Sequence, residues 1–171
     1  MGNGERGTGG DGADAVARGA PGFLRRLAGR WVEEGVVPAG GVREGEVRAF
    51  EARRGVRMPG DLRAYFLHLN GSAAPGGGPA MDRDLIRFWP LEEVSTLAEA
   101  WVPAADAGRW FVIAEYSLWT WAYTIRLSPD ADAATPVAVS FGGTELLPVA
   151  VSFEEFVGKY LARDPSVISP E

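Results

Sequence analysis

The sequence predicts an α+β fold: a mainly antiparallel sheet with N-terminal helices and a closing C-terminal helix packed on it. Residues 21–71 show helical periodicity, residues 85–149 show strand-like alternation, and residues 152–163 form a capped amphipathic segment. Because helical and extended segments are segregated along the chain, the helices are expected to cover mainly one face of the sheet.

The chain is expected to hold one domain, from residue 21 to 165, between a tail at 1–20 and a C-terminal tail at 166–171. Residues 1–20 are rich in glycine and poor in large apolar side chains, so we expect them to be flexible. Gly2, Gly4 and Gly7 match GxGxxG, but a dinucleotide fingerprint needs a strand before it and a helix after it. We interpret this match as fortuitous.

Three amphipathic helices are expected before residue 72. Gly35 and Gly55 end the first two, and Pro59 suits the first turn of the third. Asn70-Gly71 suits its end, because glycine takes a positive φ without a Cβ clash. The apolar positions are Phe23, Leu27 and Trp31 in the first helix, Val47 and Phe50 in the second, and Leu62, Tyr65, Phe66 and Leu69 in the third.

Residues 72–84 form a Gly/Pro-rich loop without the Gly-Lys-Ser/Thr of a phosphate-binding loop, which favours a linker. Strands are expected at 85–89, 110–115, 119–127, 137–141 and 145–149, with a short helix at 91–101. Pro148 predicts an edge strand or a bulge. Ser152 and Glu155 form a capping box that announces the closing helix.

The composition contains little catalytic apparatus. The chain has no cysteine and one histidine, His68, and it lacks a GxSxG elbow, so we predict no enzyme, no cofactor and no metal. Residues 64–171 carry 14 acidic and 6 basic side chains, which argues against nucleic acid and favours a basic partner. No apolar run is long enough for a bilayer, and no signal peptide is visible, so a cytoplasmic location is expected.

Two groups of residues are candidates for a site. Asp82 and Asp84 are a carboxylate pair in a loop, which would make at best a weak hard-cation site. Tryptophans on strands are usually core residues, yet tryptophan and tyrosine are also preferred anchors of protein interfaces. The predicted partner-binding residues are Asp82, Asp84, Trp89, Glu115, Tyr116, Trp119 and Trp121.

Several blocks together resemble the SUKH superfamily. They are Phe50-Glu51, Gly55-Val56, Met58-Pro59, Asp61-Leu62-Arg63, Tyr65-Phe66-Leu67 and Asn70-Gly71, followed by IRFWPLEEV at 86–94, FVIAEY at 111–116 and SFEEFVGKYL at 152–161. The sequence departs from the family pattern after Ala114, where Glu-Tyr-Ser-Leu-Trp replaces an Asp/Gly-rich turn.

The resemblance implies a bacterial immunity protein, without enzymatic activity, that binds and neutralises a cognate polymorphic toxin, often a nuclease or deaminase. The acidic C-terminal part would complement a basic toxin. Two alternatives stay open: a regulatory or scaffold module without a toxin, and a small enzyme or metal-binding protein that uses Asp82, Asp84 and Glu115.

Overall fold

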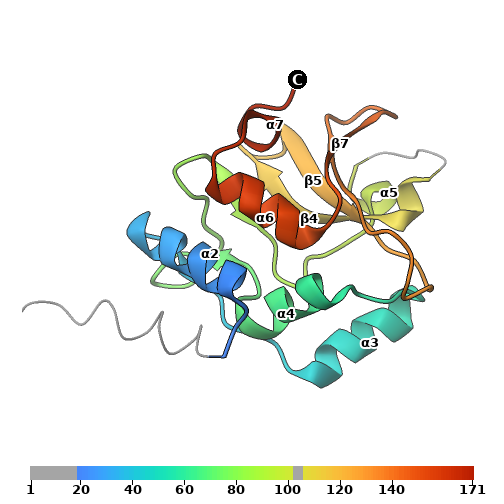
Figure 1. Cartoon of the computed structure of the whole chain (residues 1–171), viewed down its shortest axis with the longest axis horizontal. Helices are drawn as coiled ribbons and strands as arrows, with labels where there is room; N and C mark the ends of the chain where they lie inside the picture. The colour runs from blue at the N-terminus through green and yellow to red at the C-terminus, as the bar shows by residue number, and fades with distance from the viewer. Residues whose placement is uncertain (1–18, 102–105) are drawn as a thin grey trace, which may run out of the picture.

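The computed structural model describes residues 19–101 and 106–171, so most of the predicted N-terminal tail lies outside the described residues. It confirms an α+β fold (Figure 1). The helices are α2 (Gly22–Glu33), α3 (Glu44–Arg54), α4 (Gly60–His68), α5 (Leu97–Ala100), α6 (Phe153–Leu161) and α7 (Pro165–Ile168), with a 3-10 helix η1 (Ala107–Arg109). The strands are β1 (Val37–Pro38), β2 (Ser72–Ala73), β3 (Ile86–Phe88), β4 (Trp110–Tyr116), β5 (Trp121–Arg126), β6 (Val137–Ser140) and β7 (Leu146–Ala150).

The main sheet has the strand order β3-β4-β5-β6-β7, and every neighbouring pair is antiparallel. It is therefore a simple meander in which each strand pairs with the next along the chain. Pro148 lies on β7, an edge strand, where its missing N–H removes no hydrogen bond from a central ladder. The separate pair β1–β2 joins the chain before α3 to the chain after α4.

Helices α2 and α4 both pack against α6 (Figure 1). Aromatic side chains of all three helices contact the sheet. Trp31 of α2 meets Phe88 of β3 edge-on, with ring centroids 5.3 Å apart. Phe156 of α6 lies 5.1 Å from Tyr123 of β5, so α6 sits directly over the sheet. All four of these side chains are at most 1% exposed, which places the core between the helices and this face.

Helix α4 follows its predicted pattern closely. Leu62, Tyr65, Phe66 and Leu69 are each at most 1% exposed. After the helix the backbone of Gly71 takes a φ of 99°, and an added Cβ there would lie 2.8 Å from the nitrogen of Pro90. Glycine is thus required both by the turn and by the close approach of the chain that follows β3.

The structure differs from the expected elements in several places. Helix α5 begins only at Leu97, because Thr96 caps it by accepting a hydrogen bond from the Glu99 N–H. The Ser152 cap forms as expected, but the Glu155 carboxylate accepts from the Val151 N–H rather than from Ser152. Strands β1 and β2 and helix α7 lie in segments where no element was predicted, and α7 buries Val167.

Candidate partner-binding surface

A left-handed turn joins β4 to β5 at one end of the sheet. Ser117, Leu118 and Trp119 have φ values of 43°, 55° and 71°, a region that non-glycine residues rarely adopt. The Thr120 N–H donates to the Tyr116 carbonyl at 3.0 Å, and the Ser117 N–H donates to the Leu85 carbonyl at 2.8 Å. Left-handed backbone disfavours an L-residue by about 1–2 kcal/mol, so these hydrogen bonds hold a strained turn.

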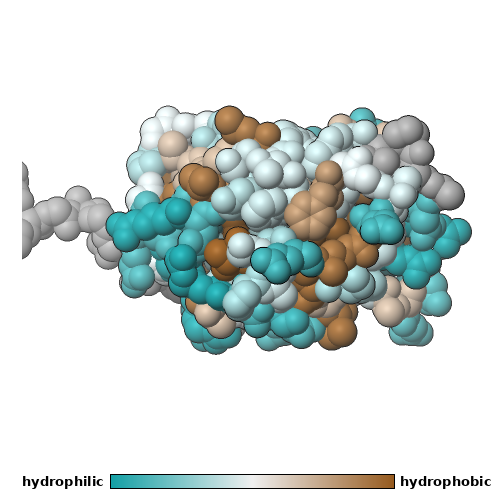
Figure 2. Space-filling model, turned by 90° about the horizontal axis from the view of Figure 1, so that it is seen from above, coloured by the Kyte–Doolittle hydropathy of each residue, from teal (hydrophilic) through white to brown (hydrophobic). Residues whose placement is uncertain are grey.

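The strained turn lifts an apolar side chain into solvent. Leu118 is 80% exposed, and Leu85, whose backbone bonds to the turn, is 45% exposed with a φ of 60°. Phe141, just after β6 at the same end of the sheet, is 48% exposed. Seen from the side of α7 and the C-terminus, the surface shows hydrophobic side chains in several groups between hydrophilic ones (Figure 2).

An aromatic stack supports this end of the sheet on the face that α6 covers. Tyr123 contacts Phe156 of α6, and Trp121, two residues earlier on β5, lies on the same face. Tyr116 stacks on Trp121 with ring centroids 3.7 Å apart and an interplanar angle of 2°. Phe141 meets Trp121 edge-on at 5.9 Å. We call Leu85, Tyr116, Leu118, Trp121 and Phe141 the turn surface.

A second aromatic cluster contains three tryptophans beside the same turn. The Trp119 ring lies 4.9 Å from the Trp89 ring and 5.8 Å from the Trp101 ring, both edge-on. Trp101 in turn packs against Gly142, where an added Cβ would lie 2.8 Å from Cζ2 of the indole. The cluster therefore packs against Trp119, the last left-handed residue of the turn, and holds it in place.

Two of the predicted site residues are buried beneath the turn. Glu115 is 4% and Trp89 is 5% exposed. Arg87 lies opposite Glu115 across the strands and contacts its Oε1 at 3.4 Å, while its second amino group binds Glu93 at 2.6 Å. Oε2 of Glu115 and the indole N–H of Trp89 have no partner within the described residues, a pattern that fits ordered water. These two residues support the surface rather than form it.

Asp82 and Asp84 anchor the segment that precedes Leu85. Asp82 is buried and accepts hydrogen bonds from the Tyr160 hydroxyl at 2.5 Å and from the Ile86 N–H at 2.9 Å. Burial raises the pKa of Asp82 against the lowering effect of these donors. Asp84 is 6% exposed at its side chain and pairs with Arg30 at 2.6 Å and Arg163 at 2.7 Å. Both carboxylates thus fasten the loop to α2 and α6.

The structure therefore divides the seven predicted residues into two groups. Tyr116, Trp119 and Trp121 are partly exposed at the turn, whereas the other four lie beneath or behind it. Sequence reasoning missed Leu85, Leu118 and Phe141. Phe141 precedes the predicted Gly142-Gly143 turn, a position from which exposure could have been predicted. No residue in the sequence predicts the left-handed backbone at Leu118.

Few chemical groups suited to catalysis or metal binding are gathered here. Among residues 19–101 and 106–171, no group of three or more His, Cys, Asp or Glu could hold a metal ion. His68 is only half-buried, at the C-terminal end of α4. What this end of the sheet offers chemically is an apolar and aromatic surface held in place by the packing beneath it, which is suited to binding another protein.

Comparison with known families gives one match. The SMI1 / KNR4 family (SUKH-1) matches residues 41–159, well over half of the chain, and the protein belongs to this family. This confirms the resemblance to the SUKH superfamily. A search of the curated proteins finds no match. In the part of the chain that the structure describes, no helix is long and apolar enough to cross a bilayer.

Proposed function

We propose that this protein binds a cognate bacterial toxin domain and neutralises it by direct protein–protein interaction, without enzymatic activity of its own. Membership of the SUKH-1 family supports this function. The turn surface is our candidate for the binding site, because Leu118 is 80% exposed there on a strained turn that neighbouring side chains hold in place. Strain that the surrounding structure maintains is typical of functional segments.

The charge of this part of the chain supports a basic partner. Glu145 is exposed on the turn that also carries Phe141, and residues 64–171, which include the turn surface, carry 14 acidic and 6 basic side chains. An apolar surface in an acidic part of the chain complements a basic surface with an apolar pocket, as expected of a nuclease or deaminase that binds nucleic acid. Neutralisation would follow from covering the toxin's substrate cleft.

Co-expression tests the proposal directly. The chain is co-expressed with each toxin-like C-terminal domain encoded beside its gene, and host survival and co-purification are scored. Leu118→Glu is expected to abolish rescue and to weaken the complex at least ten-fold, because it places a charge at the centre of the interface. Val151→Glu is the matched control: Val151 is 76% exposed, but it follows β7 at the opposite end of the sheet.

Two results would count against the proposal. If no neighbouring domain is toxic, or if a toxic one is neither bound nor neutralised, a regulatory or scaffold module becomes the better interpretation. If Leu118→Glu and Val151→Glu weaken the complex equally, immunity would stand but the turn surface would not be its binding site.

A further inference from the structure

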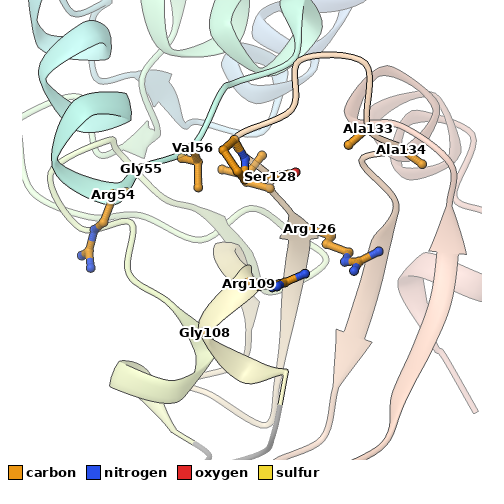
Figure 3. A pocket seen from close by; sticks show the side chains of 11 residues that line it. Arg54, Gly55, Val56, Gly108, Arg109, Arg126, Ser128, Ala133 and Ala134 are labelled. Atoms are coloured by element: carbon orange, nitrogen blue, oxygen red, sulfur yellow. The ribbon is translucent and has the colours of Figure 1, made fainter.

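A concave site, distinct from the turn surface, lies at the opposite end of β5 (Figure 3). It is a pocket of about 400 Å³ between the C-terminal end of α3, η1 and the loop after β5. None of its lining residues is acidic and three are arginine, in a chain whose formal net charge is −6. The lining residues are Arg54, Gly55, Val56, Gly108, Arg109, Arg126, Leu127, Ser128, Pro129, Ala133 and Ala134.

Backbone hydrogen bonds fix the elements that carry the arginines. The Leu127 N–H donates to the Arg109 carbonyl at 3.0 Å, which ties the end of β5 to η1. The Arg57 N–H donates to the Ser128 carbonyl at 2.8 Å, which ties the same loop to the chain after α3. The pocket is therefore built on the sheet and its neighbouring segments, not on a free loop.

The three arginines differ in how far neighbouring carboxylates neutralise their positive charge. Arg54 donates to both carboxylate oxygens of Glu99, at 2.7 and 2.9 Å, and this pairing lowers the pKa of Glu99 to about 2. In Figure 3 its side chain extends away from the other two. Arg109 has only a long 3.8 Å contact with Asp106, and both side chains are more than half exposed, so the pair contributes little.

Arg126 has no carboxylate within ion-pair distance among the residues that the structure describes. Its side chain and that of Arg109 lie on the same side of the loop (Figure 3). Asp130 and Asp132 belong to this loop, but both are exposed and neither lines the pocket. Two arginines thus line one concave site whose lining contains no acidic side chain, so the site attracts an anion.

We propose that this pocket binds a small phosphate-bearing ligand through Arg109 and Arg126. A phosphate monoester carries a charge of about −1.5 to −2 at pH 7 and has three acceptor oxygens, so it matches two guanidinium forks, whereas a carboxylate neutralises only one. The Ser128 side chain adds a polar group at the loop, and Val56, Leu127 and Pro129 supply apolar walls for the organic part of the ligand. This site is separate from the turn surface and goes beyond the proposed function.

Calorimetric titration of the purified chain at low ionic strength tests the proposal, with phenyl phosphate, inorganic phosphate and acetate as probes. Saturable binding of phenyl phosphate is expected, tighter than that of inorganic phosphate, and Arg109→Ala and Arg126→Ala should each weaken it at least ten-fold. Arg26→Ala is the matched control, because Arg26 is an exposed arginine on α2 that does not line this pocket. Binding should also weaken as the pH falls through about 6, where the phosphate loses its second charge.

Absence of saturable phosphate binding would overturn the proposal, and so would equal losses in Arg26→Ala and Arg126→Ala. Acetate binding as tight as phenyl phosphate would overturn the assignment to phosphate. Arg109 is 68% exposed at its side chain, so its substitution tests binding without removing packing from the core. Rescue from the toxin should be unchanged in Arg109→Ala, which separates failure at this site from failure at the turn surface.

Discussion

At the scale of single residues, carboxylates hold segments of this chain that have little regular structure. Asp82 holds the loop before β3 in place by accepting hydrogen bonds from the backbone N–H groups of Asp84 and Ile86 and from the Tyr160 hydroxyl. Glu51 serves the turn after α3 by accepting from the Met58 N–H at 2.8 Å and pairing with Arg63 at 3.1 Å. Both are less than 10% exposed, so their loss leaves donors unsatisfied in a dry environment.

Asp82→Ala is expected to lower the free energy of unfolding by about 3 kcal/mol, because it leaves the two N–H groups and the hydroxyl without an acceptor. Asp82→Asn keeps a carbonyl oxygen for the N–H groups and removes a buried charge, so it should change the free energy by less than about 1 kcal/mol. Urea unfolding at pH 7 measures both. Equal effects of the two variants would show that the charge itself holds the loop.

Glu51 makes part of the stability pH-dependent. Burial alone would raise its pKa, but the Met58 N–H and Arg63 outweigh burial and lower it below 4.5. A carboxyl with a lowered pKa in the folded state adds stability above its unfolded pKa and loses that contribution as the pH falls through the folded value. Glu51→Gln should therefore lower the free energy of unfolding by about 1–2 kcal/mol at pH 7.

The difference between Glu51→Gln and the unchanged protein should disappear in acid, below the pKa of the folded state. Denaturant unfolding across a pH series from neutral to acid measures it, and Glu33→Gln, at an exposed position on α2, is the control. A difference that stays constant with pH would assign the effect to packing instead of charge.

At the scale of elements, two glycines near α3 have opposite roles. An added Cβ at Gly41 would lie 1.8 Å from the Leu67 carbonyl oxygen of α4, whereas Gly45 in the first turn of α3 has open space around it. Gly41→Ala should lower the free energy of unfolding by about 3 kcal/mol or more, because backbone must move. Gly45→Ala should raise it by about 0.5–1 kcal/mol, since alanine favours the helix. Thermal unfolding of both variants checks the contrast.

The left-handed turn predicts a conflict between stability and binding. Leu118→Gly relieves the strain of a φ of 55° and removes a side chain that makes little contact, so the melting temperature should rise. The same change removes the apolar centre of the turn surface, so affinity for the toxin should fall at least ten-fold. A variant that loses stability would show that the Leu118 side chain packs against the protein and is not free for a partner.

The sequence predicted the long, periodic elements and missed those fixed by contacts between distant segments. Helix α4 was predicted from its apolar spacing and its Asn70-Gly71 end, since both signals are local. Strands β1 and β2 have two residues each, too few for any period to appear, and they exist because they pair with each other. The turn at Leu118 contains no glycine or asparagine, so the signal for positive φ is absent.

The candidate site, like the fold, was predictable only in part. Aromatic residues on neighbouring strands pointed to this end of the sheet, because Tyr116 and Trp121 flank a short connection. Exposure was not predictable: Trp89 and Glu115 look as suitable for binding as Trp121, yet register and burial place them beneath the surface. The arginine pocket, which is the pocket lined by Arg54, Arg109 and Arg126, joins residues from three separate segments, and the sequence gives no sign that Arg109 and Arg126 line the same cavity.

At the scale of the whole molecule, charge is unevenly distributed. Residues 23–63 carry 9 basic and 6 acidic side chains, while residues 64–171, which include the turn surface, carry 6 and 14. Such a distribution orients an approaching basic partner and speeds its association. The arginine pocket contains basic residues from both parts of the chain, so its positive charge is opposite in sign to the net charge of the molecule.

Association with a basic toxin should therefore depend on salt. Between about 0.01 M and about 1 M salt the Debye length falls from about 30 Å to about 3 Å. We expect the association rate constant to fall at least ten-fold over this range while the dissociation rate constant changes much less, as stopped-flow measurements would show. A salt-independent association rate would mean that the acidic charge of residues 64–171 does not guide the toxin.

The packing of α2 also shows that the folding unit is longer than the segment that the family matches. The match begins at residue 41, yet α2 ends before it and buries Trp31 and Leu27 completely. Truncation to the matched residues would remove α2 and α7 together, and with them the Trp31 ring that contacts Phe88 and the Val167 carbonyl that accepts from the Tyr123 hydroxyl. Fragments for toxin or ligand assays should therefore extend from before Gly22 to beyond Ile168, because a shorter fragment would test misfolding and not recognition.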